Sequence, residues 1–237
     1  MKNKTFGVIG AMESEVAQLR GALTDAETRT VAGLAFFSGR LGANRVVLVK
    51  SGIGKVNAAR CAQILIDVYA PDYVINTGIA GGVGEGLAVA DVVIGTELVQ
   101  HDFDVRAFGY ARGNLCEPEH RDTPTVFRSD AGLIDAFRAA AASLLDEKRV
   151  KTGRIATGDL FVASAEAKRD IAGTFGAVAA EMEGGAIAQV AALAGVPFIV
   201  LRAISDLADG SSPASFDEFE QETADLSASI LRKLIAG

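Results

Sequence analysis

Acidic side chains follow the ends of four apolar, valine- and isoleucine-rich runs in the sequence. They are Glu15 after residues 5–10, Asp159 after 154–157, Glu183 after 177–180 and Asp206 after 198–204. In α/β proteins, ligands bind beyond the carboxyl ends of the strands. Carboxylates crowded at such an apolar edge raise one another's pKa, which suits them to proton transfer near neutral pH. The pattern therefore predicts acid–base chemistry in one shared cleft.

Taken singly, each of these acids has a simpler explanation. An Asp or Glu just after a strand often caps the following helix, or complements the helix dipole from its first turn. Four such positions along one chain favour a shared site over four separate caps.

The elements expected to position these acids alternate between strands and helices. The predicted strands span residues 5–10, 34–39, 45–50, 73–76, 91–98, 154–157, 177–180 and 198–203, and the predicted helices span 13–23, 55–69, 131–147, 165–173, 183–194 and 216–236. Several strands lack polar alternation, as strands buried on both faces do. We therefore expect an α/β fold, a single domain over residues 1–237 with a mixed, mostly parallel central β-sheet flanked by helices.

Three local patterns refine this layout. Ser215 with Glu218 three residues later forms a capping-box pattern at the start of the last helix. Glycines between residues 78 and 86 predict a turn after the strand 73–76. Glycines and prolines scattered through residues 108–124 predict a long surface loop, a kind of segment that is often functional.

The overall composition excludes several classes of protein. The 237 residues carry 23 Lys and Arg against 30 Asp and Glu, a net charge of −7, which argues against binding to nucleic acid or anionic membranes. Two Cys and two His can form neither a disulfide framework nor a histidine-rich metal site, so we expect no metal. No apolar run reaches the ~20 residues that span a bilayer, and the N-terminus lacks a signal-peptide pattern. We expect a cytoplasmic protein.

Familiar ligand-binding motifs are incomplete in this chain. The glycines that follow residues 73–76 precede another strand pattern, whereas a dinucleotide-binding fingerprint requires a helix there. The segment Gly52-Ile53-Gly54-Lys55 resembles the end of a phosphate-binding loop, but Val49 stands where its first glycine is required, which favours a simple tight turn. The pair His101-Asp102 is a weak metal signal because no second histidine is spaced to complete a site.

Five short segments, taken in their order, give the sequence a family resemblance. They are GAMESEV at 10–16, KSGIGKV at 50–56, NTG at 76–78, EME at 181–183 and RAISD at 202–206. With this combination the chain resembles, nearly end to end, the bacterial 5′-methylthioadenosine/S-adenosylhomocysteine nucleosidases of the purine nucleoside phosphorylase superfamily. The resemblance implies a nucleoside phosphorylase-like fold without a metal or organic cofactor. It also implies hydrolysis of the bond between adenine N9 and ribose C1′ in 5′-methylthioadenosine, S-adenosylhomocysteine and 5′-deoxyadenosine.

The resemblance further implies roles for particular residues. Glu15 would activate the water, Glu183 would bind the ribose hydroxyls and stabilise the ribosyl cation, and Asp206 would protonate adenine N7. Substrate-binding roles fall on Met12, Ile79, Ala80, Gly81, Phe161, Val162, Met182, Ser205 and Phe216, and Val105 and Phe108 would reach into the neighbouring subunit's pocket of a homodimer.

These binding residues are expected to divide the substrate between them. Phe161 would stack on adenine, with Val162 offering backbone groups to the base edge. Met182 would pack against the ribose, and Met12 and Phe216 would wall the pocket for the 5′-alkylthio group. Two positions depart from the family pattern: Ile79 stands where relatives often have Ser, and Leu160 is bulkier than the usual residue.

Three alternative hypotheses remain open at this point. The chain could be a nucleosidase for another adenine nucleoside such as aminofutalosine, a nucleoside phosphorylase, or a non-catalytic adenosine-binding module. Phosphorolysis requires cationic and amide groups around an anion, whereas Glu15 would repel phosphate, so hydrolysis is favoured. The joint presence of Glu15, Glu183 and Asp206 favours catalysis over binding alone.

Overall fold

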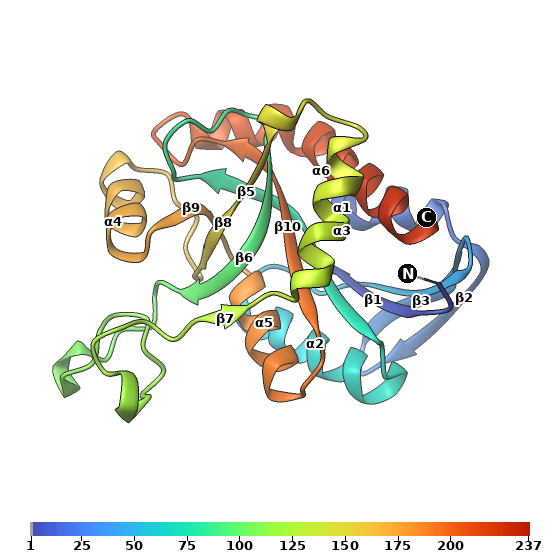
Figure 1. The fold of residues 1–237 in the computed structure, drawn as a ribbon, viewed down its shortest axis with the longest axis horizontal. Coiled ribbons are helices and arrows are strands. Elements are labelled where there is room, and N and C mark those ends of the chain that lie inside the picture. Colours follow the sequence, from blue (N-terminus) through green and yellow to red (C-terminus); the bar gives the residue numbers. More distant parts are fainter. Residues whose placement is uncertain (1) are drawn as a thin grey trace.

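One mixed β-sheet runs through the molecule and carries helices on both of its faces (Figure 1). The computed structural model describes residues 2–237. The strands are β1 Thr5–Gly10, β2 Thr24–Val31, β3 Leu34–Leu41, β4 Asn44–Lys50, β5 Tyr73–Gly82, β6 Val92–Gln100, β7 Phe127–Arg128, β8 Val150–Thr157, β9 Ala177–Glu181 and β10 Phe198–Asp206. The helices are α1 Glu13–Gly21, α2 Lys55–Tyr69, α3 Ala131–Ala142, α4 Ala165–Phe175, α5 Gly184–Leu193 and α6 Ser212–Ala236, with short 3₁₀ turns at Arg106–Phe108, Pro118–His120 and Glu147–Arg149.

The sheet contains two groups of parallel strands, and antiparallel pairings connect these groups. Strands β4, β1, β5 and β10 pair in parallel, as do β6, β8 and β9. The two groups meet through antiparallel pairs of β10 with β6 and of β5 with β9, which close part of the sheet on itself. The carboxyl ends of β1, β9 and β10 are thereby brought together. The predicted α/β class with a mixed, mostly parallel sheet is confirmed.

The two largest of three apolar cores lie on the two faces of the sheet, and the smallest includes Ile171 and Phe175 of α4. On one face, α2 and the small, alanine-rich α5 pack together against the strands, around Leu65, Ile187 and Val200. On the other face, α1, α3 and α6 cover β1, β4 and β10 around Leu19, Phe137 and Leu231. None of the helices in the described part of the chain is long and apolar enough to cross a membrane.

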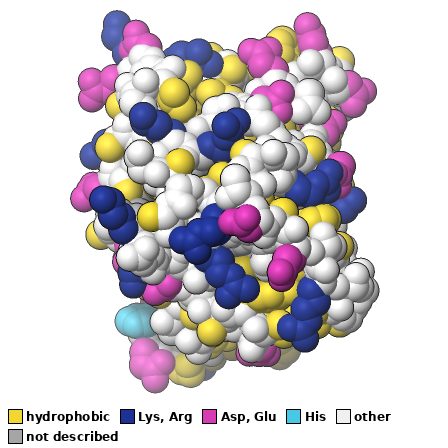
Figure 2. All heavy atoms as spheres, turned by 90° about the vertical axis from the view of Figure 1, so that its right-hand side faces the viewer, with side chains coloured by type: hydrophobic (Ala, Val, Ile, Leu, Met, Phe, Trp, Pro, Cys, Tyr) yellow, Lys and Arg dark blue, Asp and Glu magenta, His cyan; other side chains and the backbone are white. Residues whose placement is uncertain are grey.

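The strand predictions missed β2 and stopped β5 and β10 too early. β2 is almost wholly exposed and polar, so its sequence has no apolar periodicity. Figure 2 shows one face of the molecule, on which side chains of both charges are mixed. The glycines after Asn76 were predicted to form a turn, which is wrong for residues 77–82, because β5 continues through Gly82. β10 likewise extends to Asp206, with an irregularity in its pairing to β5 between Ile204 and Asp206.

Helix ends also differ from the predictions. α3 ends at Ala142 rather than at 147, and the residues beyond it form a turn that leads into the 3₁₀ segment Glu147–Arg149. α6 begins at Ser212, so Ser215 lies inside the helix and the predicted capping box at 215–218 is wrong. The stretch 108–124 is irregular, as predicted, and contains the 3₁₀ turn Pro118–His120.

Candidate active site

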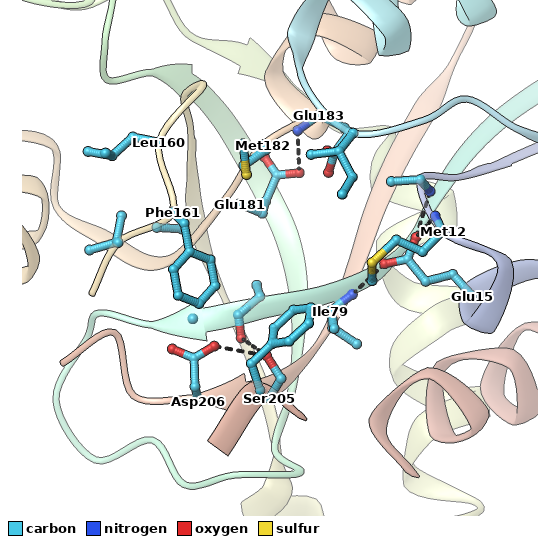
Figure 3. A pocket seen from close by; sticks show the side chains of 17 residues that line it. Met12, Glu15, Ile79, Leu160, Phe161, Glu181, Met182, Glu183, Ser205 and Asp206 are labelled. Carbon is cyan, nitrogen blue, oxygen red and sulfur yellow. Dashed lines mark hydrogen bonds between the residues drawn. The ribbon is translucent and has the colours of Figure 1, made fainter. Parts of the chain in front are cut away.

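A pocket opens where the carboxyl ends of β1, β9 and β10 meet the start of α6 (Figure 3). About 620 Å³ of atom-free space, including solvent at its open side, lies within it. Among the residues predicted from sequence, those that line it are Met12, Glu15, Ile79, Ala80, Gly81, Phe161, Val162, Met182, Glu183, Ser205, Asp206 and Phe216. Residues that span most of the chain length are therefore gathered in one place.

Val105 and Phe108 do not line this pocket. They lie at the 3₁₀ turn Arg106–Phe108 in the segment after β6, which projects from the body of the molecule in Figure 1. The Phe108 side chain is 74% exposed. The described part of the chain therefore leaves most of this aromatic ring uncovered.

Glu15 is fixed by backbone amides at the deep end of the pocket. Its Oε2 accepts hydrogen bonds from the N–H groups of Ala11 and Met12, and its Oε1 accepts one from Ile79 at 3.2 Å. Burial raises the pKa of this carboxyl above its usual range, although the nearby Arg202 and the three amides partly offset the effect. The side chain therefore sits in one orientation with its affinity for a proton increased.

Gly78 makes room for this arrangement. A Cβ at this position would overlap the Oε1 of Glu15 and would lie 3.1 Å from Nη1 of Arg202. The glycines that obscured β5 in the sequence are therefore places where charged side chains approach the strand closely.

Arg202 and Glu181 form a buried ion pair at the pocket, which Glu181 lines. The guanidinium, with its residue only 1% exposed, donates to the carboxylate of Glu181 and to Oδ1 of Asn76. Glu181 also accepts hydrogen bonds from the Thr157 hydroxyl and from the N–H groups of Glu183 and Gly184. Burial alone would raise the pKa of Glu181, but Arg202 and these donors outweigh it and hold the pKa below its ordinary value. Glu181 is thus a fixed negative charge.

Glu183 faces the pocket from the turn that Glu181 organises. Its Oε1 accepts the N–H of Gly54 at 2.9 Å, and its Oε2 lies 3.8 Å from Nη2 of Arg202. Burial, and next the negative charge of Glu181, raise the pKa of Glu183 to about 7. Its protonation therefore changes near neutral pH, as crowded carboxylates were predicted to do.

Asp206 stands at the opposite end of the pocket. Its Oδ2 lies 2.9 Å from the Ser205 hydroxyl, which donates to it, and its Oδ1 accepts the N–H of Ala208 at 2.8 Å. A Cβ at Gly81 would lie 3.1 Å from this Oδ1, so the glycine allows the close approach of the carboxyl to β5. Both Ser205 and Asp206 are buried.

Aromatic rings form the outer wall beside Asp206. Phe161, from the segment after β8, meets Phe216 of α6 edge to face with ring centroids 5.7 Å apart. Phe161 remains 42% exposed, which leaves ring surface available to a flat ligand. Val162, Met12 and Met182 complete an apolar lining.

Sequence reasoning gave no role to several residues that build this site. Arg202 and Glu181 were noticed only as neighbours of the assigned acids, although they form the buried ion pair at the pocket. Ile53 and Leu160 line the pocket opening and are about half exposed. A glutamate and an arginine 21 positions apart give no local signal that they will pair across strands.

Fold and site together define a class of protein. Residues 5–236 match the family described as the Phosphorylase superfamily. Within it, the chain is 45% identical to the 5′-methylthioadenosine/S-adenosylhomocysteine nucleosidase of Shewanella loihica, over 90% of this chain and 91% of the relative. The chain belongs to the 5′-methylthioadenosine/S-adenosylhomocysteine nucleosidase family, as its sequence motifs predicted.

Solved structures of the family have the same fold. The corresponding nucleosidase of Neisseria meningitidis, in complex with methylthio-immucillin-A, superposes with a TM-score of 0.92 at 43% identity, covering 98% of this chain and 99% of that one. A futalosine hydrolase mutant from Helicobacter pylori superposes with a TM-score of 0.91 at 31% identity, covering 98% of each chain. The predicted nucleoside phosphorylase-like architecture is therefore confirmed.

Proposed function

We propose that this protein hydrolyses the N-glycosidic bond of 5′-methylthioadenosine and S-adenosylhomocysteine, and also of 5′-deoxyadenosine, releasing adenine and the 5′-substituted ribose. The observation that carries the proposal is the division of the pocket: Glu15 and Glu183 lie at one end, and Asp206 lies beside an aromatic wall at the other. Relatives of this chain carry the same activity in their names, and one binds methylthio-immucillin-A.

The aromatic end accommodates the base. Phe161 stacks on adenine, Val162 offers backbone groups to its edge, and Asp206 donates a proton to N7. Ser205 and the Ala208 amide hold the Asp206 carboxyl in place. As the C1′–N9 bond breaks, its electron pair moves to N9, and protonation at N7 makes adenine a neutral leaving group.

The carboxylate end accommodates the sugar. Three buried carboxylates surround one guanidinium, so the cluster has an excess of negative charge whenever Glu15 or Glu183 is ionised. A neutral ribose gains little from that excess, whereas an oxocarbenium-like ribose is attracted to it. Glu183 binds the ribose hydroxyls, Met182 packs on the ring, and Met12 and Phe216 wall the 5′ substituent. Ala80 and Gly81 of β5 pass close to the ribose.

Glu15 completes the reaction by activating water. Its carboxylate, held by three backbone amides, accepts a proton from a water molecule whose oxygen forms the new bond to C1′. The water oxygen thus replaces N9 at C1′, one water proton goes to Glu15, and the proton from Asp206 leaves with adenine.

The occupied N-terminus of α2 favours hydrolysis over phosphorolysis. The first amides of a helix are a natural site for an anion such as phosphate. Here the Gly54 N–H is bonded to Glu183 and the Lys55 N–H to Asp159, so protein carboxylates already occupy them. Glu15 and Glu183 would in addition repel a phosphate placed near C1′.

We also propose a homodimer in which Val105 and Phe108 of one subunit complete the 5′ pocket of the other. Two features support this arrangement: the exposure of Phe108 on a projecting segment, and the apolar pocket opening at Ile53 and Leu160. Measurement of the mass in solution by light scattering tests the assembly.

The activity is tested by following adenine release from 5′-methylthioadenosine with and without inorganic phosphate. We expect equal rates in both conditions and free 5-methylthioribose as the product. Strict dependence on phosphate would overturn the proposal in favour of a phosphorylase. S-adenosylhomocysteine, 5′-deoxyadenosine and aminofutalosine, run in parallel, test the substrate range, since a futalosine hydrolase shares this fold.

A further inference from the structure

Three residues outside the pocket form a closed ring of hydrogen bonds at its edge. The Lys55 N–H donates to Oδ1 of Asp159 at 2.8 Å, and the Asp159 N–H donates to Oδ2 of Asp102 at 2.9 Å. The Lys55 ammonium closes the ring on Oδ1 of Asp102 at 2.7 Å. Lys55 comes from the start of α2, Asp102 from the turn after β6 and Asp159 from the segment after β8, so the ring joins three distant parts of the chain.

The ring supplies a helix cap that α2 lacks. Its N-cap residue is Gly54, which has no side chain and a φ of 95°, a conformation that suits glycine. Asp159 therefore caps the helix from another segment, and a Cβ at Gly54 would lie 3.0 Å from its Oδ1. The neighbouring Gly54 N–H is the group that holds Glu183.

The ring is connected to both ends of the pocket. On one side, Gly54 is bonded to the carboxylate assigned to the sugar. On the other side, Asp159 is two residues before Phe161 and three before Val162, the residues assigned to adenine. The bonds of Lys55, Asp102 and Asp159 therefore connect the segment that carries the base wall to the start of α2, next to the amide that binds Glu183.

The ring is more sheltered than an ordinary surface ion pair. The side chains of Lys55 and Asp102 are 19% and 27% exposed, and the Lys55 ammonium also donates to Oε1 of Gln100 at 3.2 Å. Burial alone would raise the pKa of Asp102, but bonds from Lys55 and the Asp159 amide outweigh it and lower the pKa. The same two bonds that join the segments thus keep Asp102 charged.

We infer that Lys55, Asp102 and Asp159 are positioning residues, which hold the adenine-binding segment in register with Glu183. The inference rests on the proposed function for its catalytic consequence. Loosening the ring should let the segment 158–162 move relative to the sugar end, and a misplacement of about 1 Å can cost 100-fold in rate.

Two substitutions break the ring from different sides. Lys55→Met keeps the length of the side chain and removes the ammonium. Asp102→Asn keeps the shape, but its amide NH₂ must face one of the two donors that the carboxylate accepted. Each should lower kcat/KM for 5′-methylthioadenosine by about 10- to 100-fold, raise the adenine Kd, and speed hydrogen exchange in residues 158–163.

The double variant tests whether the two substitutions act through the same ion pair. Because both changes break one ion pair, the Lys55→Met/Asp102→Asn protein should lose no more activity than the worse single variant. Lys4→Met is the matched control: it removes a lysine paired with Asp72 at 2.9 Å, near the start of β1 and away from the pocket. It should match the wild type in kcat/KM, adenine Kd and exchange of 158–163.

The outcomes separate this inference from the proposed function. If the wild type releases adenine but both single variants keep its kcat/KM, the inference is overturned. If the wild type releases no adenine, the proposed function fails. In that case, weaker adenine binding and faster hydrogen exchange of residues 158–163 in the two variants would still support the inference about the ring. Unchanged adenine binding and exchange in that case would overturn it as well.

Discussion

The two ends of the pocket are built on different principles. The sugar end is a buried cluster of charges in which Glu15, Glu181 and Arg202 are fixed by backbone amides and by one another. The base end is an apolar wall of half-exposed rings with one acid, Asp206, held by a hydroxyl and an amide. Under the proposed function, charge would be preorganised where the sugar cation forms, whereas the flat, neutral base would need only apolar surface and a proton.

Removing the buried cation of the sugar end should have the largest effect. In Arg202→Met, three carboxylates remain buried with no positive partner, so we expect a loss of about 3–5 kcal/mol in unfolding free energy, or failure to fold. Urea denaturation measures it. Lys4→Met, which breaks an exposed pair, should cost far less than this. Equal losses in the two variants would contradict a charged cluster that depends on Arg202.

At the base end, the largest effect should come from the acid. Asp206→Asn keeps the shape and loses the proton donor, so kcat for 5′-methylthioadenosine should fall about 10²- to 10⁴-fold. Ser205→Ala, which leaves the acid in place, should lose less. Adenine release is the measurement, and an Asp206→Asn protein with the wild-type rate would remove Asp206 from the mechanism.

Gly78→Ala disturbs the geometry of the sugar end without changing any charge. The added Cβ would overlap Glu15 and approach Arg202, so one of them must move. We expect kcat/KM to fall about 100-fold, since small misplacements of reacting groups carry costs of this size. Gly86→Ala serves as a control because no atom lies within 4 Å of a Cβ there. Its positive φ of 71° will cost stability, so activity must be compared below the unfolding transition.

The pKa of Glu183 predicts a distinctive dependence of stability on pH. Its folded pKa of about 7 exceeds the ordinary value of 4.5, so between these pH values the folded state binds more protons than the unfolded state. Stability from this group is therefore complete below pH 4.5 and is lost as the pH rises towards 7. Relative to Glu183→Gln, the wild type should lose roughly 1–3 kcal/mol across that window, measured by urea denaturation. A constant difference between the two proteins would show that Glu183 titrates normally.

The smallest effect should come from the aromatic wall. Phe161→Leu keeps an apolar side chain and loses the flat ring, so KM should rise by about tenfold with little change in kcat. A loss confined to kcat would instead place Phe161 in the chemical step.

The apolar pattern of the sequence predicted the buried strands. It missed strands whose conformation depends on pairing with another strand or on close contacts with residues far away in the sequence. Residues 5–10 and 198–203 are mostly apolar, with Thr5 and Arg202 as the polar exceptions, and both are strands. β2 is polar because it lies at an exposed edge, and its strand conformation comes from pairing with β3. In β5, glycines hid the strand because they weaken β propensity, yet Gly78 and Gly81 are required where Glu15 and Asp206 approach.

The same rule applies to the site. Glu15, Glu183 and Asp206 belong to local motifs, and the structure gathers them in one pocket together with the other residues assigned to it. The Arg202–Glu181 pair and the Lys55–Asp102–Asp159 ring consist of residues far apart in sequence. Only the pairing of the strands brings them together. The sequence pattern assigned Asp159 to the shared cleft, which is wrong, because Asp159 lies outside the pocket and caps α2.

Under the proposed function, the carboxylates at the sugar end stabilise the cationic sugar and do not contribute to binding of the base. The most direct measurement compares Glu183→Gln with the wild type in two quantities, kcat/KM for 5′-methylthioadenosine and the Kd for adenine. We predict that kcat/KM falls at least about 100-fold while the adenine Kd stays within about twofold, because adenine carries no ribose. Parallel losses in both quantities would contradict the claim.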